Sequence, residues 1–279
     1  MQSIRAVFKG PTFTGTASSL LIAVLILISL SLRISAHEVW LESEEFAPSV
    51  GKSVPVGIKV GQNLEGESLV FLRRDFPRIV KHAGGRNISV TSIDGNIPAL
   101  SVLIRDRGPN IVSLASRVYE LDFETKEKLA EYLDLEGYTK LAESTRASLQ
   151  NPIEISEEYE RNAKTVLFGD GKRQGRDQRS GLELEFVFED DFSRFVMGNK
   201  VRARLLKSGR PLPNIPVKAI ATGRQPAAAF LVTDAAGRVE IPLDSKGQWL
   251  INAVYFSRWP SGATGEIKSI WSSYTFDVE

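Results

Sequence analysis

The chain contains two histidines, His37 and His82, and no cysteine. His37 directly follows Ala36, a small residue of the kind that precedes a secretory cleavage site. Cleavage after Ala36 would make His37 the amino-terminal residue, with a free α-amine beside the imidazole Nδ1. These two nitrogens form a chelate that suits Cu(II) or Ni(II). Because the reference pKa of an α-amine is about 7.7–8, the amine can release its proton to a metal near neutral pH.

The other ligands of such a site would come from the second imidazole and from nearby carboxylates. The predicted metal ligands are therefore His37, His82 and Glu38, with Glu42 as a further carboxylate and nickel or copper as the ion. The absence of cysteine excludes thiolate metal sites, disulfides and cysteine nucleophiles. A site built from three histidines of one chain is also excluded. The alternative interpretation of His37 is that it merely follows a cleavage site.

The first 36 residues have the pattern of a secretory signal. A basic start with Arg5 and Lys9 precedes an apolar run over 20–32, which is shorter than the roughly 20 residues that a membrane-spanning helix needs. This pattern predicts a signal peptide over 1–36 and an exported, periplasmic mature protein. If the segment is not cleaved, it would instead anchor the chain to the inner membrane.

Charge is balanced along the chain, with 35 basic and 34 acidic residues. Three basic residues and no acid lie in 1–36, so the mature chain would carry 32 basic and 34 acidic side chains, a net charge of about −2. This balance lacks the electrostatic signature of a nucleic-acid-binding protein, and we expect no nucleic-acid partner.

Short runs of β-branched and apolar residues, separated by turn residues, fill residues 37–121. Such spacing is typical of a β-sandwich. Within it, Asp94-Gly95 has the sequence of a hairpin turn, because glycine readily adopts positive φ.

Residues 122–168 are rich in Glu, Lys, Leu and Ala and predict a helical insert. Leucine spacing favours one helix over about 124–136, and Gly137 stands where a helix-ending residue with positive φ is expected. A second helix is predicted over about 138–149, and a third short helix is predicted after Ser156.

The remaining chain divides into a charged, glycine-rich exposed loop over 169–181 and a second β-sandwich over 182–279. In that sandwich a turn is predicted from Asp234, which bonds nearby amides, to Gly237 at positive φ. The predicted fold class is mainly β, with two tandem immunoglobulin-like or transthyretin-like sandwiches and a small helical insert after an amino-terminal signal helix.

No sequence pattern of a known catalytic site is present. The chain has no nucleophile elbow, zinc-protease motif, phosphate-binding loop or calcium loop. Adjacent acids such as Asp190-Asp191 point to opposite faces of an extended chain, so they are interpreted as turn residues. We therefore expect a protein that is not an enzyme.

Several segments together resemble one known family. They are the start HEVWLE, the stretch SGRPLPNIPVKAIATG, the turn TDAAGRVEIPL, the strand GQWLINAVYF and the end WSSYTFDVE. In this order they resemble the NikM-like family, a domain of unknown function described as a substrate-specific component of nickel uptake. Ala36, His37, Trp40 and Leu41 match its Ala-His-x-x-Trp-Leu start. Many members have a further histidine late in the chain, where this sequence has Tyr255.

The leading hypothesis is thus an exported, non-enzymatic protein that binds nickel or copper and delivers it to a membrane transporter component. Two alternatives remain open at this point. One is an extracytoplasmic adhesion or carbohydrate-binding module, because immunoglobulin-like sandwiches serve many functions. The other is a copper oxidase that uses an amino-terminal histidine with His82 facing it.

Overall fold

The computed structural model describes residues 37–224 and 228–279, and residues 1–36 and 225–227 lie outside the described part. The predicted signal segment, 1–36, thus lies outside the described residues. Residues from His37 to Glu279 form one compact unit. This unit is mainly β, as the sequence predicts. No helix in its described residues is both long and apolar enough to cross a bilayer.

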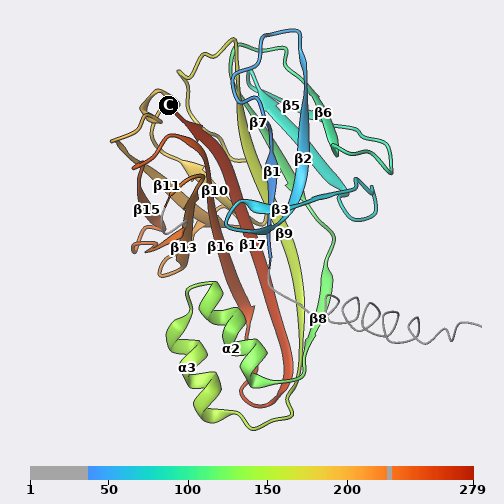
Figure 1. Ribbon diagram of the computed structural model, residues 1–279, viewed down its shortest axis with the longest axis vertical. Helices are drawn as coiled ribbons and strands as arrows, with labels where there is room; N and C mark the ends of the chain where they lie inside the picture. Colours follow the sequence, from blue (N-terminus) through green and yellow to red (C-terminus); the bar gives the residue numbers. More distant parts are fainter. Residues whose placement is uncertain (1–36, 225–227) are drawn as a thin grey trace, which may run out of the picture. The chain divides into compact units, whose positions relative to one another are not determined.

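A nine-stranded sheet forms the centre of the unit (Figure 1). Its strands, in spatial order, are β14 (Ala228–Val232), β13 (Pro216–Ala221), β16 (Gly247–Arg258), β17 (Thr264–Val278), β9 (Glu154–Gly169), β7 (Gly108–Ala115), β4 (Arg78–Ala83) and β5 (Arg86–Ser89), and β8 (Tyr119–Phe123) also pairs with β9. The long strands β9 and β17 are parallel, and the other pairs in this sheet are antiparallel.

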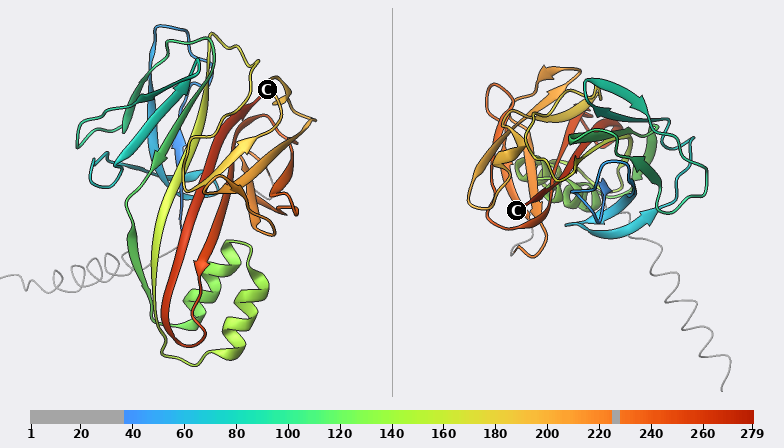
Figure 2. Two further views of the ribbon diagram at one scale, coloured as in Figure 1. Left: turned by 180° about the vertical axis from the view of Figure 1, so that it is seen from behind. Right: turned by 90° about the horizontal axis from the view of Figure 1, so that it is seen from above.

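Two four-stranded sheets cover the central sheet. The first contains β1 (Glu38–Glu42), β2 (Ser53–Gln62), β3 (Glu65–Leu69) and β6 (Leu100–Leu103). The second contains β10 (Leu184–Phe188), β11 (Lys200–Lys207), β12 (Arg210–Pro211) and β15 (Arg238–Pro242). Seen from above, the blue strands of the first sheet and the orange strands of the second lie on different sides (Figure 2).

The two small sheets pack on opposite faces of the central sheet. Val112 and Leu167 belong to the core beneath the first small sheet, whereas their neighbours Ile111 and Val166 belong to the core beneath the second. Adjacent residues of a strand point to opposite faces, so β7 and β9 contribute to both cores. The prediction of two sandwiches with a small helical insert is confirmed, and the two sandwiches share one sheet.

The strand β1 joins the beginning of the described chain to its end. The hydroxyl of Ser273 on β17 donates to the carbonyl of Val39 at 2.7 Å, and the hydroxyl of Thr275 donates to the carbonyl of Leu41. Trp40, between these two residues, is fully buried. The amino-terminal strand is therefore an integral part of the fold.

The two α-helices of the described residues form a hairpin beside one end of the long strands (Figure 1). They are α2 (Lys126–Leu135) and α3 (Thr139–Ser148), close to their predicted positions. The side chain of Thr125 caps α2, and Gly137 has φ of +83° after its end, as predicted. One turn of 3₁₀ helix, η2 (Phe192–Arg194), follows β10.

The predicted third helix is wrong. The residues after Ser156 belong to the 16-residue strand β9. Their Glu, Ala and Lys residues have favourable helix propensities, but β9 pairs with three strands and fills both cores. Tertiary pairing therefore outweighs local preference in this segment.

The structure also differs from the predictions for one turn and one loop. Asp94-Gly95 does not form a hairpin, because the flanking strands β5 and β6 pair with β4 and β2 rather than with each other. The stretch 169–181 is not a wholly exposed loop, because Asp177 is fully buried beside Lys164, with 3.2 Å between its Oδ1 and the lysine Nζ. By contrast, Gly237 has φ of +71° and Asp234 Oδ1 accepts from the amides of Ala236 and Arg238, as predicted.

Candidate site at the amino-terminal strand

His37 lies directly before β1 and is half-buried. Its carbonyl accepts a hydrogen bond from Arg161 Nη2 on β9 at 3.3 Å. Glu38 pairs with Gly61 in the antiparallel ladder, so the neighbouring β2 residue of His37 is Gln62. The backbone of His37 therefore has a fixed position at the end of the β1–β2 pair.

Glu38 is fully buried and points into the protein. Its Oε2 accepts from the backbone amide of Asn63 at 3.2 Å, and its Oε1 accepts from Lys218 Nζ at 2.6 Å. Adjacent side chains on a strand point to opposite faces, so the Glu38 carboxylate and the His37 imidazole diverge. Both carboxylate oxygens of Glu38 already have partners within the fold.

His82 is buried on β4, and both of its ring nitrogens have partners. Nδ1 lies 2.7 Å from Asn87 Oδ1, and Nε2 lies 2.9 Å from Ser113 Oγ. Burial lowers the pKa of His82, which favours the neutral ring. This arrangement is that of a structural histidine in a saturated hydrogen-bond network.

His37 and His82 lie on opposite sides of the central sheet. His82 bonds Ser113, whose neighbour Val112 packs under the first small sheet, so Ser113 and His82 face the second small sheet. The strand β1 that follows His37 packs on the other face, where Leu41 shares a core with Val112. The structure therefore does not bring the predicted ligands His37, His82 and Glu38 together. Within residues 37–224 and 228–279, no group of three His, Asp or Glu side chains is arranged to hold a metal ion.

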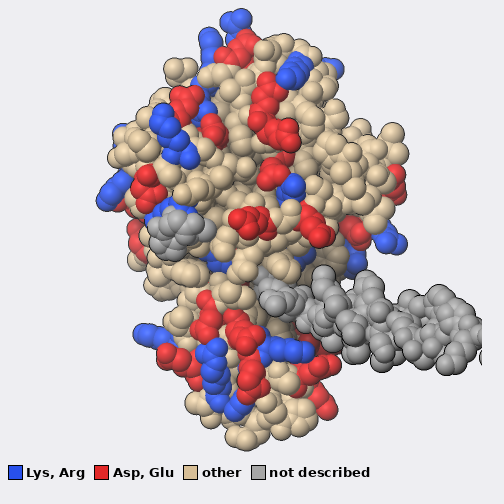
Figure 3. Space-filling view, in the orientation of Figure 1, with Lys and Arg blue, Asp and Glu red and all other residues tan. Residues whose placement is uncertain are grey.

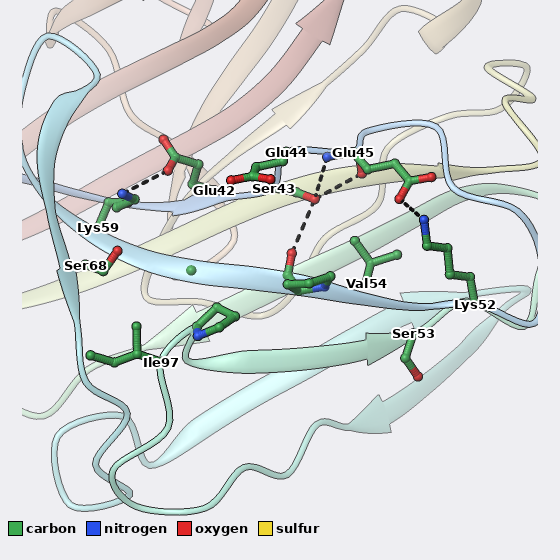
Figure 4. A pocket seen from close by; sticks show the side chains of 13 residues that line it. Glu42, Ser43, Glu44, Glu45, Lys52, Ser53, Val54, Lys59, Ser68 and Ile97 are labelled. Atoms are coloured by element: carbon green, nitrogen blue, oxygen red, sulfur yellow. Dashed lines mark hydrogen bonds and ion pairs between the residues drawn. The ribbon is translucent and has the colours of Figure 1, made fainter.

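Glu42, the further predicted carboxylate, lines a surface cavity of about 800 Å³ (Figure 4). It lies 3.2 Å from Lys59 Nζ, and Glu45 in the same cavity pairs with Lys52. Ser43 Oγ donates to the carbonyl of Glu45 at 3.0 Å. Each of these two carboxylates has its own lysine, so the cavity is a network of ion pairs rather than a set of free ligands.

A buried charged cluster beneath β1 was not predicted from the sequence. Lys218 Nζ on β13 donates to Glu38 Oε1 and, at 3.1 Å, to Glu136 Oε1. Asn252 Nδ2 on β16 donates to Glu136 Oε2 at 3.2 Å. We call these four residues the Lys218 cluster. Glu136 follows the last residue of α2, so the cluster joins four separate parts of the chain.

In the Lys218 cluster, two carboxylates share one ammonium group. This excess of acidic groups affects the pKa values of the cluster. Burial raises the pKa of Glu136 to about 7, because the attraction of Lys218 opposes the rise only in part and Glu38 adds to it. Burial alone would lower the pKa of Lys218, but Glu136 and Glu38 outweigh it and the pKa of Lys218 is raised. The lysine is therefore charged, and Glu136 is partly protonated near neutral pH.

A pocket of about 530 Å³ opens above Lys218. Its lining consists of Gln62, Asn63, Glu131, Asp134, Leu135, Lys218, Ala228 and Phe230. The pocket combines apolar walls with a few polar groups, and it lies beside Glu136, whose pKa is raised. This combination is typical of ligand-binding sites.

The chain matches one family model, over residues 34–257, which is described as "Domain of unknown function (DUF4198)". The chain belongs to this family. The description of the DUF4198 family states no activity, and it does not name nickel uptake. A search of curated proteins finds no match to this DUF4198 chain.

Three solved structures are distantly similar to the DUF4198 chain. A tetra-tandem repeat from the extending region of a large adhesion protein is 11% identical, with 87% of this chain and 50% of that chain covered and a TM-score of 0.20. The chain thus spans about half the length of that structure. The D0–D1 domain of intimin is 9% identical, with 84% and 96% covered and a TM-score of 0.21. The fibronectin(III)-like modules of Clostridium thermocellum CbhA are 9% identical, with 86% and 94% covered and a TM-score of 0.20. Likenesses this weak carry no argument about function.

Proposed function

We propose that this DUF4198 protein is an exported, non-enzymatic protein that binds Ni(II) or Cu(II) through His37 at its mature amino terminus. The observation that carries the proposal is where the fold begins. The compact unit starts at His37, and the residue after it is already fully buried. The predicted cleavage after Ala36 would thus release a folded body whose first residue is the histidine.

The setting of His37 suits a chelate of α-amine and Nδ1. The hydrogen bond from Arg161 to its carbonyl and the pairing of β1 fix the backbone, so little further ordering accompanies metal binding. The half-buried position leaves the residue in reach of solvent. The positive charge of Arg161 works against a cation, which favours moderate rather than very tight binding.

Such a site suits delivery of metal rather than its storage. Glu38 and His82 have their donor atoms engaged inside the fold, so the amino terminus supplies only two nitrogens. The other coordination positions would be filled by water or by a receiving protein. We therefore propose the periplasm as the location and a membrane uptake component as the partner.

The proposal is tested with two versions of the protein that both begin at His37, one with a free α-amine and one with the α-amine acetylated. Calorimetric titration with Ni(II) and Cu(II) should show at least tenfold weaker binding to the acetylated version, because its blocked amine no longer donates to the metal beside the imidazole. His37→Ala at the first position should weaken binding similarly. Equal affinities for the two versions would exclude this site, and mass spectrometry of the exported protein checks where the chain begins.

A further inference from the structure

The pocket above Lys218 has three kinds of wall. One is Lys218, whose side chain is only 5% exposed. Leu135 from α2 and Ala228 and Phe230 from β14 supply apolar surface, and Gln62 at the end of β2 and Asn63 after it supply polar surface. The volume of about 530 Å³ accommodates a small organic molecule.

The charges around this pocket favour a cation over an anion. Lys218 is already bonded to two carboxylates, Glu38 and Glu136, so it cannot act as a free anion receptor. Glu131 and Asp134 of α2 line the pocket, and Asp134 pairs with Arg146 at 2.5 Å. Asp134 and Lys218 thus have partners of opposite charge, and Glu131 is the charged lining residue for which the described residues show no ion pair. A bound anion would be repelled by Glu131, whereas a cation would be attracted to it.

The aromatic wall adds a second reason to expect a cation with an apolar body. Phe230 is 51% exposed, an unusual state for so large an apolar side chain. Its ring lies against the end of α2, because a Cβ built on Gly137 would come within 2.8 Å of Phe230 Cδ1 and 2.9 Å of Pro216 Cβ. The ring thus adjoins Gly137 at one edge, and about half of the residue is exposed. Aromatic faces attract ammonium groups through their quadrupole.

We propose that this pocket binds a small organic ammonium compound, with its charged group toward Glu131 and its apolar body against Phe230 and Leu135. The site adjoins His37, whose neighbour Gln62 lines the pocket, but its ligand contacts other residues and needs no metal. Both charge and apolar area are required, so neither an inorganic cation nor a neutral apolar compound should replace the ligand.

Ligand binding should be linked to the protonation of Glu136. The groups that face it are Lys218 from β13, Glu38 from β1, Asn252 from β16, Glu157 from β9, and Tyr132 and Tyr138 at the two sides of its own turn. Of these, Lys218 is the one cation. A second cation nearby would stabilise the ionised carboxylate, so binding should release a proton and strengthen between pH 6 and pH 8.

The experiment uses three probes of one shape on the protein beginning at His37, with a chelator present to exclude metal. Benzylamine carries the ammonium group, benzyl alcohol is neutral, and benzoate is anionic. Calorimetry or NMR titration should show benzylamine binding at least tenfold more tightly than either of the others. Benzoate binding as well as benzylamine, or no binding of the amine at millimolar concentration, would overturn the proposal.

Three variants test the location of the site, and a fourth tests its pH dependence. Glu131→Gln and Phe230→Ala should each weaken benzylamine binding at least threefold, while Glu143→Gln, an exposed acid on α3 outside the pocket, should leave it unchanged. Glu136→Gln should remove the rise in affinity with pH. Unchanged affinity in both pocket variants would refute the proposed location. His37→Ala leaves every residue that lines this pocket unchanged, and the benzylamine titration is made with a chelator present, so failure of either proposal is visible separately.

Discussion

Lys218 Nζ lies 2.6 Å from Glu38 Oε1, and the two residues are 180 positions apart in the chain. Their side chains are 5% and 0% exposed. This ion pair fixes the first strand of the fold to β13 at a place where both side chains are almost wholly buried. Removal of either charge would leave the other with little solvent to replace its partner.

Lys218→Met should therefore destabilise the protein by about 3–5 kcal/mol, because Glu38 and Glu136 would remain as buried carboxylates without a cation. Urea unfolding at pH 8 measures the change. Lys200→Met is the matched control, because Lys200 and its partner Glu240 are both more than half exposed and the loss should stay below about 1 kcal/mol. Similar losses in the two variants would mean that the buried cluster has no special importance for stability.

Stability should fall as the pH rises through neutrality, because of Glu136. The pKa of Glu136 is about 7 in the folded protein and 4.5 as an ordinary glutamate, so the folded state binds the proton more tightly. This tighter proton binding contributes at most about 3 kcal/mol to the free energy of unfolding. The contribution is fully present below about pH 4.5 and is lost as the pH rises through 7. The unfolding free energy of the wild type, relative to that of Glu136→Gln, should therefore decrease as the pH rises from 5 to 8. A constant difference would contradict the raised pKa.

Gly237→Ala should cost about 2 kcal/mol or more, through both backbone strain and a clash. Gly237 has φ of +71°, and a Cβ there would lie 2.8 Å from the amide nitrogen of Leu212. Gly85 is a close control, because it has the same φ of +71° and nothing within 4 Å of the added Cβ. Gly85→Ala should cost only about 1 kcal/mol. Thermal or urea unfolding checks both, and equal losses would show that the close contact with Leu212 is relieved at no cost.

His82→Ala should lower stability by about 2–4 kcal/mol and leave nickel and copper binding unchanged. The loss follows from an emptied buried site and from the removal of the imidazole partner of Ser113 and Asn87. Metal binding should persist because His82 lies across the central sheet from His37. Unfolding together with metal titration measures both effects, and Ser89→Ala on exposed β5 serves as the surface control. Loss of metal binding in folded His82→Ala would show that the two histidines act together after all.

Local signals predicted local structure well. The leucine spacing and Gly137 placed α2 within two residues of its ends, and Asp234 with Gly237 defined a turn correctly. Both features depend on side chains and backbone angles within a few residues. The strand β9 could not be predicted in the same way, because its partners β7 and β17 lie far away in the sequence.

The residues of the candidate site divide in the same way, into those that local sequence predicts and those that it does not. His37 could be singled out because the signal pattern before it is a continuous stretch of sequence. The Lys218 cluster could not, because Glu38, Glu136, Lys218 and Asn252 come from distant elements. One sequence signal was present: Lys218 stands alone as a charge in the otherwise apolar strand PVKAIA. A lone charge in a buried strand indicates a buried partner, although it does not identify it.

The bonds from Ser273 to Val39 and from Thr275 to Leu41 connect residues 234 positions apart. Contacts of such long sequence separation form slowly. Nearly the whole chain must be closed into a loop, at a cost in conformational entropy, before these hydrogen bonds can stabilise the fold. The first strand consequently has no complete place to dock until the last strand has been synthesised. If the chain is exported as proposed, this order of events would keep the polypeptide unfolded until its carboxyl end has been released. In that unfolded state the polypeptide could pass through a narrow translocation channel.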